Sequence, residues 1–381
     1  VDNTLHALQK AAAYYVRKFP NLKRIAVTGS SGKTTAKECI ASVLSGHYNV
    51  IMNEGNLNSE TGLPLSVFKI TEKHEIGIFE MGMNRHGEIK ELADVFFPEV
   101  AVITNIGTAH IGIFGTQDKI AEEKKQIFSN FVNNSVGFIF EDEPYYDFLV
   151  KNHNAKFYTY GEKTTGGISS VKNKGIHGSD IEYDSVTIAF PLAGEYNVQH
   201  ACAAIAVGQY FSLCAEEIKH GLESVKPLFG RTQLLEGKPT IIQDCYNGNY
   251  ESMTAALGFF SSIEWQAKKI LVLGDMLELG EKSKEIHKKI AEHAILSPVH
   301  IIFFIGENFF DVMQKKDIDS HKKVFYTKNI DDESLKALIF SAGDIINPQD
   351  LVLIKGSRGI SLERTVQMLR NAVKIYSEGK Q

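Results

Sequence analysis

Residues 24–38, RIAVTGSSGKTTAKE, constrain the fold of this chain more than any other stretch. A short apolar run from Ile25 to Val27 is typical of a buried strand, the glycine-rich TGSSG follows it, and a helical pattern begins at Lys33. In such a strand–loop–helix arrangement, the glycines let the backbone approach an anion, and the amide N–H groups at the helix start face that anion. The stretch therefore predicts a phosphate-binding loop. A glycine-rich turn that carries a surface lysine is the open alternative.

The details of the loop predict the role of each residue. We expect Lys33 to reach the β- and γ-phosphates of a nucleotide and the Thr34 hydroxyl to bind a magnesium ion. The usual loop has a glycine five residues before its final Gly-Lys pair, and this chain has Val27 there, so it matches only the shorter pattern G-x-x-G-K-T. The residues expected to bind the nucleotide at this loop are Gly29, Ser30, Ser31, Gly32, Lys33, Thr34 and Thr35.

Composition excludes several classes of protein. The chain has 381 residues, enough for two or three domains, and 43% hydrophobic residues, which is ordinary for a globular protein. A net charge of −5 gives no reason to expect a nucleic-acid partner, and no apolar run is long enough to insert in a membrane. The four cysteines are scattered without a C-x-x-C spacing, so we expect buried or idle thiols in a reducing cytoplasm.

Apolar runs alternate with helical patterns through the first 160 residues, which predicts an α/β fold with a parallel sheet and helices on both faces. An amphipathic helix is expected over 3–18. Strands are expected at 24–28, 48–52, 76–80, 100–104, 136–140 and 156–160, and helices at 33–45, 61–69, 87–95, 117–132 and 143–151.

The alternation then breaks and resumes. Residues 165–190 contain glycines and short alternating stretches that predict a small antiparallel sheet, followed by helices near 197–211 and 215–223. A second, smaller α/β domain is expected after a boundary near Pro227–Arg231. Its strands are expected at 232–236, 239–243, 268–273, 300–305, 323–326 and 350–354, and its helices at 250–262, 283–295, 331–340 and 362–375.

Polar residues follow several of the predicted strands of the first domain. Glu80 ends a strand, where an α/β sheet exposes its ligand-binding edge, so it is a candidate magnesium ligand; an ordinary surface charge is the alternative. His110 follows the next strand and could bind a second metal ion through a ring nitrogen, or could be a half-buried histidine bonded to backbone. The adjacent Lys124 and Lys125 lie on a predicted helix, where a solvated face is the ordinary interpretation.

The second half offers a weaker set of candidates. Arg231 lies at the domain junction and could stabilise charge on a transferring phosphoryl group or form an interdomain salt bridge. Asp244 ends a strand, and Tyr246 and Asn247 in the following turn could frame a base, although turns are rich in such residues for conformational reasons alone.

Taken together, these segments resemble the Mur ligases, which are ATP-dependent ligases of bacterial cell-wall synthesis. The segments that carry the resemblance are TGSSGKTTAKE, GNLNSETGLPLSVF, FEMGMNRHGEI, TNIGTAHIGIFGTQDKIAEEK, GEYNVQHACAAIAVG, GRTQ, DCYNGNYESM, LGDMLELG and KGSR. They cover nearly the whole chain in the family's order. LGDMLELG, and EMGM with GEI, favour the member of the family that joins D-alanyl-D-alanine to a UDP-linked muramoyl tripeptide.

The resemblance implies a central P-loop ATPase domain over 21–228 and a C-terminal Rossmann-like domain over 229–381. Residues 1–20 resemble the linker after an N-terminal UDP-binding domain, which we expect to be absent from this chain. The implied cofactors are ATP and two magnesium ions, and the implied substrates are a UDP-linked muramoyl peptide and D-alanyl-D-alanine. A cytoplasmic enzyme is implied, and we expect it to act as a monomer.

The resemblance also implies roles for single residues. Glu80 and His110 would bind magnesium, and Lys124 falls where the family carries a carbamylated lysine that supports the second ion. Arg231 would contact the γ-phosphate. The nucleotide would also meet His200, Asp244, Tyr246 and Asn247, and the residues expected on the substrate side are Asn56, Asn58, Lys355, Ser357 and Arg358.

Two segments depart from the family's pattern. The family segment H-N-x-x-N, whose last Asn reads adenine, is YNVQH here, so Tyr196 and His200 are substitutions and base selectivity is open. The family segment D-D-S-Y-N-A-N-P is QDCYNGNY here, with changes at Gln243, Cys245, Gly248 and Tyr250.

Two other functions remain open at this point. One is a related ATP-dependent amide ligase, of the folylpolyglutamate or another Mur type, that acts on a different carboxylate. The other is a nucleotide-binding protein with a regulatory or scaffolding role and no ligase activity.

Overall fold

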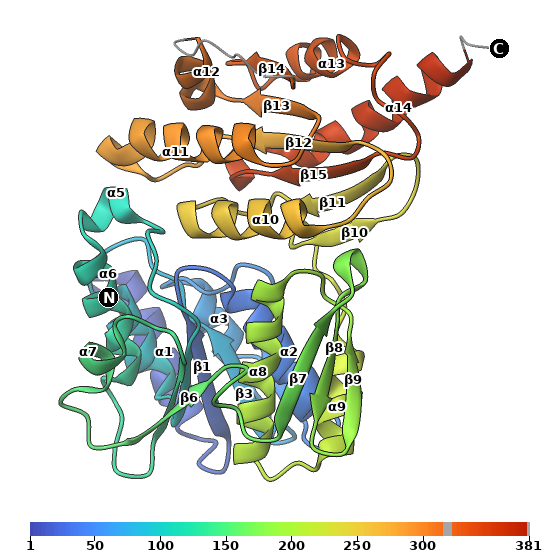
Figure 1. Ribbon diagram of the computed structural model, residues 1–381. Helices are drawn as coiled ribbons and strands as arrows, with labels where there is room; N and C mark the ends of the chain where they lie inside the picture. Colours follow the sequence, from blue (N-terminus) through green and yellow to red (C-terminus); the bar gives the residue numbers. More distant parts are fainter. Residues whose placement is uncertain (315–321, 379–381) are drawn as a thin grey trace. The chain divides into compact units, whose positions relative to one another are not determined.

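The computed structural model describes residues 1–314 and 322–378, which form two compact units (Figure 1). The first unit comprises Val1–Pro191 and Glu195–Lys226, and the second comprises Leu192–Gly194 and the chain from Pro227 onward. Both units are α/β, as the alternation of apolar runs and helical patterns predicted. Within the described residues, no helix is long and apolar enough to cross a membrane.

The first unit is built on a six-stranded sheet in which every neighbouring pair is parallel, with the order β2-β3-β1-β4-β5-β6. Its strands are β1 (Lys23–Thr28), β2 (Val50–Met52), β3 (Ile76–Glu80), β4 (Val100–Ile103), β5 (Val136–Phe140) and β6 (Lys156–Tyr160). In the register, Val27 of β1 pairs with Glu80 of β3 on one side and with Val102 of β4 on the other. The loops that follow β1, β3 and β4 therefore leave the sheet side by side.

Helices cover both faces of this sheet. The stacking of Phe96 on Phe79, with ring centroids 4.4 Å apart, places α4 on one face. On the other face α8 lies against β5 and β6 and packs on α2. The helices of the unit are α1 (Thr4–Val16), α2 (Lys33–Ser45), α3 (Gly62–Val67), α4 (Glu88–Phe96), α5 (Ile111–Phe114), α6 (Gln117–Lys125), α7 (Tyr146–Val150), α8 (Glu195–Tyr210) and α9 (Ala215–Glu223), with 3-10 turns η1 (Gln126–Phe128) and η2 (Gly175–His177).

Residues 165–190 contain the predicted antiparallel sheet. Its strands β7 (Ile168–Asn173), β8 (Ser179–Tyr183) and β9 (Val186–Phe190) pair in chain order, and α9 packs on β9. Tyr183 and Phe190 are buried because alternate residues of β8 and β9 face the unit.

The second unit has its own six-stranded sheet with the order β10-β11-β15-β12-β13-β14, parallel except at β10. Its strands are β10 (Gln233–Leu235), β11 (Thr240–Asp244), β12 (Lys269–Gly274), β13 (Ile301–Ile305), β14 (Lys323–Thr327) and β15 (Leu351–Lys355). Its helices are α10 (Tyr250–Ser262), α11 (Ser283–Leu296), α12 (Glu307–Met313), α13 (Asp332–Phe340) and α14 (Thr365–Glu378), with 3-10 turns η3 (Gly280–Lys282), η4 (Arg358–Ile360) and η5 (Leu362–Arg364). Every residue of β12, β13 and β15 is buried, as expected for central parallel strands.

The N-terminal helix α1, expected as a linker, is part of the first unit. It packs on α3 and α4, Ala12 and Val16 are fully buried, and the Tyr15 hydroxyl donates a hydrogen bond of 2.8 Å to the carbonyl of Ile70. The helix predicted over 117–132 is shorter, because α6 ends at Lys125 and a 3-10 turn follows.

Candidate nucleotide and metal site

The phosphate loop lies between β1 and α2 and is built around two glycines. Gly29 approaches Thr104 so closely that a Cβ atom there would lie 1.8 Å from the Thr104 hydroxyl oxygen. Gly32, which precedes α2, has a φ of 77°, and a Cβ atom there would meet the ring of His200 at 2.2 Å. Both positions therefore require glycine, because a side chain at either would clash with Thr104 or His200.

The loop after β4 holds the phosphate loop in place. The backbone N–H groups of Ser30 and Ser31 both donate to Oδ1 of Asn105, at 3.0 and 2.9 Å. The Thr104 hydroxyl donates to the Ser31 carbonyl at 2.6 Å, and the N–H of Gly107 donates to the Ser30 hydroxyl at 2.8 Å. Sequence reasoning missed Asn105, although its place directly after a predicted strand was a usable signal.

Two lysines converge on one carbonyl group of this loop. The side-chain amines of Lys33 and Lys124 each donate to the carbonyl oxygen of Gly29 at 2.9 Å. Lys124 is 1% exposed, and its burial and then the nearby charge of Lys33 hold its pKa well below the usual range. Lys125 lies on another side of α6, where its amine donates to the carbonyls of Phe148 and Lys151. Lys124 is therefore not on a solvated face.

Glu80 lies beside the phosphate loop and is almost completely buried, which excludes the surface-charge interpretation. The Thr34 hydroxyl donates a hydrogen bond of 2.6 Å to Oε2 of Glu80, and the side-chain amide of Asn58 donates one of 2.7 Å to Oε1. Asn58, which we expected on the substrate side, thus contacts Glu80 directly. Asn56, two residues earlier, is exposed.

The oxygen atoms at the phosphate loop fit magnesium only in part. The described residues contain no group of three or more His, Cys, Asp and Glu side chains that could hold a metal ion by themselves. Magnesium, however, is usually bound through one or two carboxylates together with substrate phosphates. The adjacent oxygens of Thr34 and Glu80 at the phosphate loop fit that pattern.

The two histidines named from the sequence differ in their surroundings. His110 directly precedes α5 in the segment after β4, with a φ of 64°. His200, on α8, is buried with its ring against the backbone of Gly32. The structure thus places His200 against the phosphate loop itself, while its role toward the base remains a prediction.

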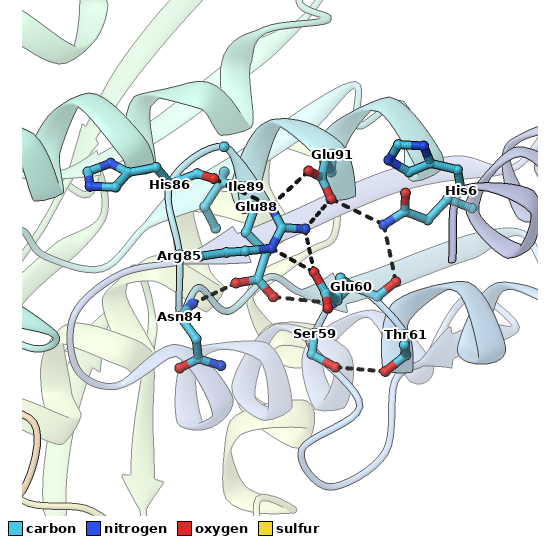
Figure 2. Close-up of polar contacts among 12 residues, drawn as sticks. His6, Ser59, Glu60, Thr61, Asn84, Arg85, His86, Glu88, Ile89 and Glu91 are labelled. Carbon is cyan, nitrogen blue, oxygen red and sulfur yellow. Dashed lines mark hydrogen bonds and ion pairs between the residues drawn. The ribbon is translucent and has the colours of Figure 1, made fainter. Parts of the chain in front are cut away.

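A charged network ties the segment after β3 to its surroundings (Figure 2). Arg85 lies between Glu60 and Glu91: its Nε donates to Oε2 of Glu60 at 2.8 Å, and a terminal nitrogen donates to Oε1 of Glu91 at 2.8 Å. These hydrogen bonds raise the pKa of Arg85 and lower that of Glu91. Gln9 of α1 joins the network through Oε2 of Glu91 at 3.2 Å. The loop before α3 is thereby fixed to α4 and α1.

The carboxylate of Glu123 holds the helix that carries Lys124. It accepts hydrogen bonds from the backbone N–H groups of Gly87 and Ile89, at 2.8 and 3.0 Å, and so binds the N-terminal end of α4. Sequence reasoning missed Glu123, because nothing in its spacing distinguishes it from the exposed Glu122.

In the second unit, buried Lys355 and partly buried Asp244 form an ion pair at the ends of β15 and β11. The amine of Lys355 lies 2.7 Å from Oδ2 of Asp244 and donates to the carbonyl of Asn247 at 3.3 Å. The guanidinium of Arg231 lies over the ring of Tyr246, 4.2 Å from its centroid. Five of the predicted residues of this unit are thus grouped at one edge of its sheet.

Ser357 and Arg358 follow β15 and differ in setting. The hydroxyl of buried Ser357 accepts from the N–H of Leu277 at 2.9 Å and donates to the carbonyl of Gly248 at 3.3 Å, so it joins two strand-end loops. Arg358 is exposed and pairs with Glu363 at 2.6 Å. Their expected contacts with substrate remain predictions.

Comparison with protein families gives two matches in chain order. Residues 27–208 match the Mur ligase middle domain, and residues 230–358 match the Mur ligase glutamate ligase domain.

Similar proteins with curated names include two ligases. The chain is 43% identical over 370 residues to the UDP-N-acetylmuramoyl-tripeptide–D-alanyl-D-alanine ligase of Treponema pallidum, covering 97% of this chain and 79% of that protein. It is 37% identical to the ligase of the same name from Bacillus subtilis, covering 97% of this chain and 80% of that one.

Solved structures give the same result. A MurF crystal structure from Acinetobacter baumannii has a TM-score of 0.88 and 28% identity, covering 97% of this chain and 81% of that one. The MurF ligase of Thermotoga maritima, solved in complex with ADP, has a TM-score of 0.84 and 26% identity, covering 98% of this chain and 85% of that one.

Proposed function

The chain belongs to the Mur ligase family, and from that premise we propose that it joins D-alanyl-D-alanine to UDP-N-acetylmuramoyl-tripeptide in peptidoglycan synthesis, with conversion of ATP to ADP and phosphate. The observation that carries the proposal is the 43% identity, over 97% of this chain, to a ligase that bears this name. Both units of the structure contribute to that match.

The reaction joins a carboxylate to an amine in two steps. The γ-phosphoryl group of ATP moves to the substrate carboxylate, which gives an acyl phosphate and ADP. The amine of D-alanyl-D-alanine then attacks the acyl carbon through a tetrahedral intermediate, and phosphate leaves with one oxygen of the former carboxylate.

We assign the nucleotide phosphates to the phosphate loop and the start of α2. The N-terminal end of α2 favours an anion, Gly29 and Gly32 let the loop turn closely into that helix, and Asn105 fixes the loop by accepting from the N–H groups of Ser30 and Ser31. The Lys33 amine is close enough to this backbone to bond Gly29, and from there it would offset phosphate charge.

Magnesium, when bound, offsets the negative charge of the triphosphate and the carboxylate as they approach each other. Thr34 and Glu80 would hold it, since their oxygens are adjacent at the loop, and His110 is the third candidate ligand. That the site binds two magnesium ions remains a prediction.

We propose that Lys124 is carbamylated in the active enzyme. Only a neutral amine reacts with carbon dioxide to form a carbamate, and burial beside Lys33 lowers the pKa of Lys124 and so favours the neutral form. The product is an anion with oxygen ligands suited to magnesium. The carbamate would also place a negative charge near the Lys33 amine, which contacts the same carbonyl as Lys124, and the two opposite charges attract.

The other expected site residues are assigned by the same family resemblance. Arg231 would contact the γ-phosphate, and the group of Asp244, Tyr246 and Asn247 would frame the nucleotide. Lys355, Ser357 and Arg358 would meet the incoming peptide. We further propose a central ATPase domain over 21–228, a ligase domain over 229–381, and a cytoplasmic monomer.

Phosphate release against a panel of amine acceptors tests the function. With UDP-N-acetylmuramoyl-tripeptide and ATP, we expect D-alanyl-D-alanine to stimulate release and glutamate or single D-alanine to give only background. Equal stimulation by glutamate would instead support a ligase of the folylpolyglutamate or another Mur type, and no stimulation by any acceptor would support a nucleotide-binding protein without ligase activity.

A further inference from the structure

All four polar atoms of Glu80, two in its backbone and two in its side chain, form hydrogen bonds with other side chains. Its carboxylate oxygens accept from Asn58 and Thr34, and its backbone N–H and carbonyl are both bonded to the side chain of Asn53. The backbone bonds are 2.9 Å each, and Asn53 is 2% exposed. Neither the backbone nor the carboxylate of Glu80 is therefore free to turn.

The loop that supplies these contacts is itself fixed. The side-chain amide of Asn53 also donates to the carbonyl of Leu57 at 2.8 Å, directly before Asn58. The carbonyl of Asn53 accepts from the buried amine of Lys37 on α2 at 2.6 Å. Two residues beyond Asn58, Glu60 is bound by Arg85 (Figure 2). The amide of Asn58 therefore approaches Glu80 from a rigid support.

The two oxygens of Glu80 are consequently not equivalent. Oε1 is bonded by the Asn58 amide at 2.7 Å, whereas Oε2 faces the Thr34 hydroxyl at the start of α2. A carboxylate held in this way presents one oxygen to a cation at the phosphate loop. Magnesium requires near-ideal octahedral geometry at about 2.0–2.1 Å, whereas calcium accepts bidentate carboxylates in flexible geometry.

We propose that Asn58 is a positioning residue that makes Glu80 a one-oxygen ligand and so favours magnesium over calcium at this site. The proposal rests on the assignment of Glu80 as a metal ligand under the proposed function. Partners of metal ligands typically contribute 10- to 100-fold to metal affinity, so the effect of Asn58 is measurable.

The test uses ADP binding rather than turnover. Calorimetric titrations of the whole protein with ADP at increasing magnesium give the magnesium concentration that half-maximally strengthens ADP binding. We expect Asn58→Ala to raise that concentration about tenfold and to leave ADP affinity without magnesium unchanged. Glu54→Gln, a change at an exposed position of the same loop that we assign to no site, should leave both quantities unchanged.

A double mutant separates this inference from the proposed function. If Asn58 acts through Glu80, then Asn58→Ala has no further effect on the magnesium requirement in a Glu80→Ala background. A Glu80→Ala variant with the normal magnesium requirement would overturn the metal assignment itself. Two outcomes would overturn only the role of Asn58. In one, Glu80→Ala raises the magnesium requirement and Asn58→Ala does not. In the other, the double mutant shows the sum of the two single effects.

Calcium provides the second measurement. The same titrations with calcium should show a smaller preference for magnesium over calcium in Asn58→Ala than in the parent protein, because both oxygens of Glu80 become available. An unchanged preference would overturn the one-oxygen argument.

Discussion

The carbonyl of Gly29 accepts from two lysine side chains, and the two lysines differ in their relation to solvent. Lys33 lies at the start of α2 and is only partly buried, whereas Lys124 is almost completely buried on α6. Desolvation and the charge of Lys33 both disfavour a second ammonium group there, so the pKa of Lys124 is lowered. Substitutions at these two residues should therefore reduce activity for different reasons.

Lys33→Ala should abolish ATP turnover and leave the fold intact. The side chain is not part of a core, and its loss removes positive charge from the phosphate loop, where an electrostatic donor typically contributes about 10²–10³-fold to the rate. Phosphate release measures turnover, and circular dichroism measures the fold. Turnover at the parent rate would show that the loop does not bind the reacting phosphates.

Lys124→Ala should lose most activity, and short-chain carboxylic acids such as acetate should partly restore it. The added carboxylate would occupy the space of the lost side chain and supply the oxygens that a carbamate supplies. Phosphate release with and without acid measures the rescue. A loss that no acid restores would leave Lys124 important and its carbamylation unsupported.

Lys125 provides the matched control for Lys124. It is one residue further along α6, about 100° around the helix, and bonds the carbonyls of Phe148 and Lys151. Lys125→Ala should be nearly silent in the same assay. An essential Lys125 beside a dispensable Lys124 would contradict the assignment.

At the scale of elements, the phosphate loop depends on its close approach to the segment after β4. Gly29→Ala would place a methyl group 1.8 Å from the Thr104 hydroxyl oxygen and break the contacts between the two loops. We expect a loss of about 1–3 kcal/mol in the free energy of unfolding, as for overpacked sites, together with weaker ADP binding. Denaturant unfolding and calorimetry measure the two effects.

Gly166→Ala is the control for that substitution. Gly166 belongs to the same unit, and nothing lies within 4 Å of a Cβ atom added there. Its free energy of unfolding should change by less than about 0.5 kcal/mol. Equal effects of the two substitutions would mean that the approach of Gly29 to Thr104 does not matter.

The sequence predicts the bounds of several strands and helices correctly. The strands at 76–80, 136–140 and 156–160 and the helices at 33–45 and 250–262 have the predicted bounds. The short helices α5 and α12 were missed, whereas α3 and α7, which are similarly short, lie within predicted helices. The antiparallel edge strand β10 was expected as a strand, but its direction is set by pairing with β11 and not by local pattern.

Some residues of the candidate site were predicted from the sequence and others were missed. Lys33, Thr34 and Glu80 were identified because each lies at a strand end or in the phosphate loop. Asn53 and Asn105 were missed although each directly follows a predicted strand, because the residues that they bond are far away in sequence. Glu123 has no such local signal, since its partners Gly87 and Ile89 are known only once the fold brings α6 to the start of α4.

At the scale of the whole molecule, the predicted residues fall into two groups, one on each unit. The phosphate loop, Glu80 and Lys124 belong to the first unit, and Asp244 with Lys355 belongs to the second. Both groups lie at the carboxyl ends of parallel strands, where open α/β sheets bind ligands. The proposed ligase binds three substrates, namely ATP and the two molecules that it joins, and each of the two sheet edges is a candidate binding surface for some of them.

The central claim is that this protein joins D-alanyl-D-alanine to a carboxylate that ATP has activated. Mass spectrometry of a reaction with ATP, D-alanyl-D-alanine and UDP-N-acetylmuramoyl-tripeptide labelled with ¹⁸O in its terminal carboxylate tests it in one measurement. We predict a product that is heavier than the labelled substrate by the dipeptide less H₂¹⁸O, with one ¹⁸O atom in the released phosphate. Phosphate without ¹⁸O, or release of phosphate without the dipeptide product, would contradict the account.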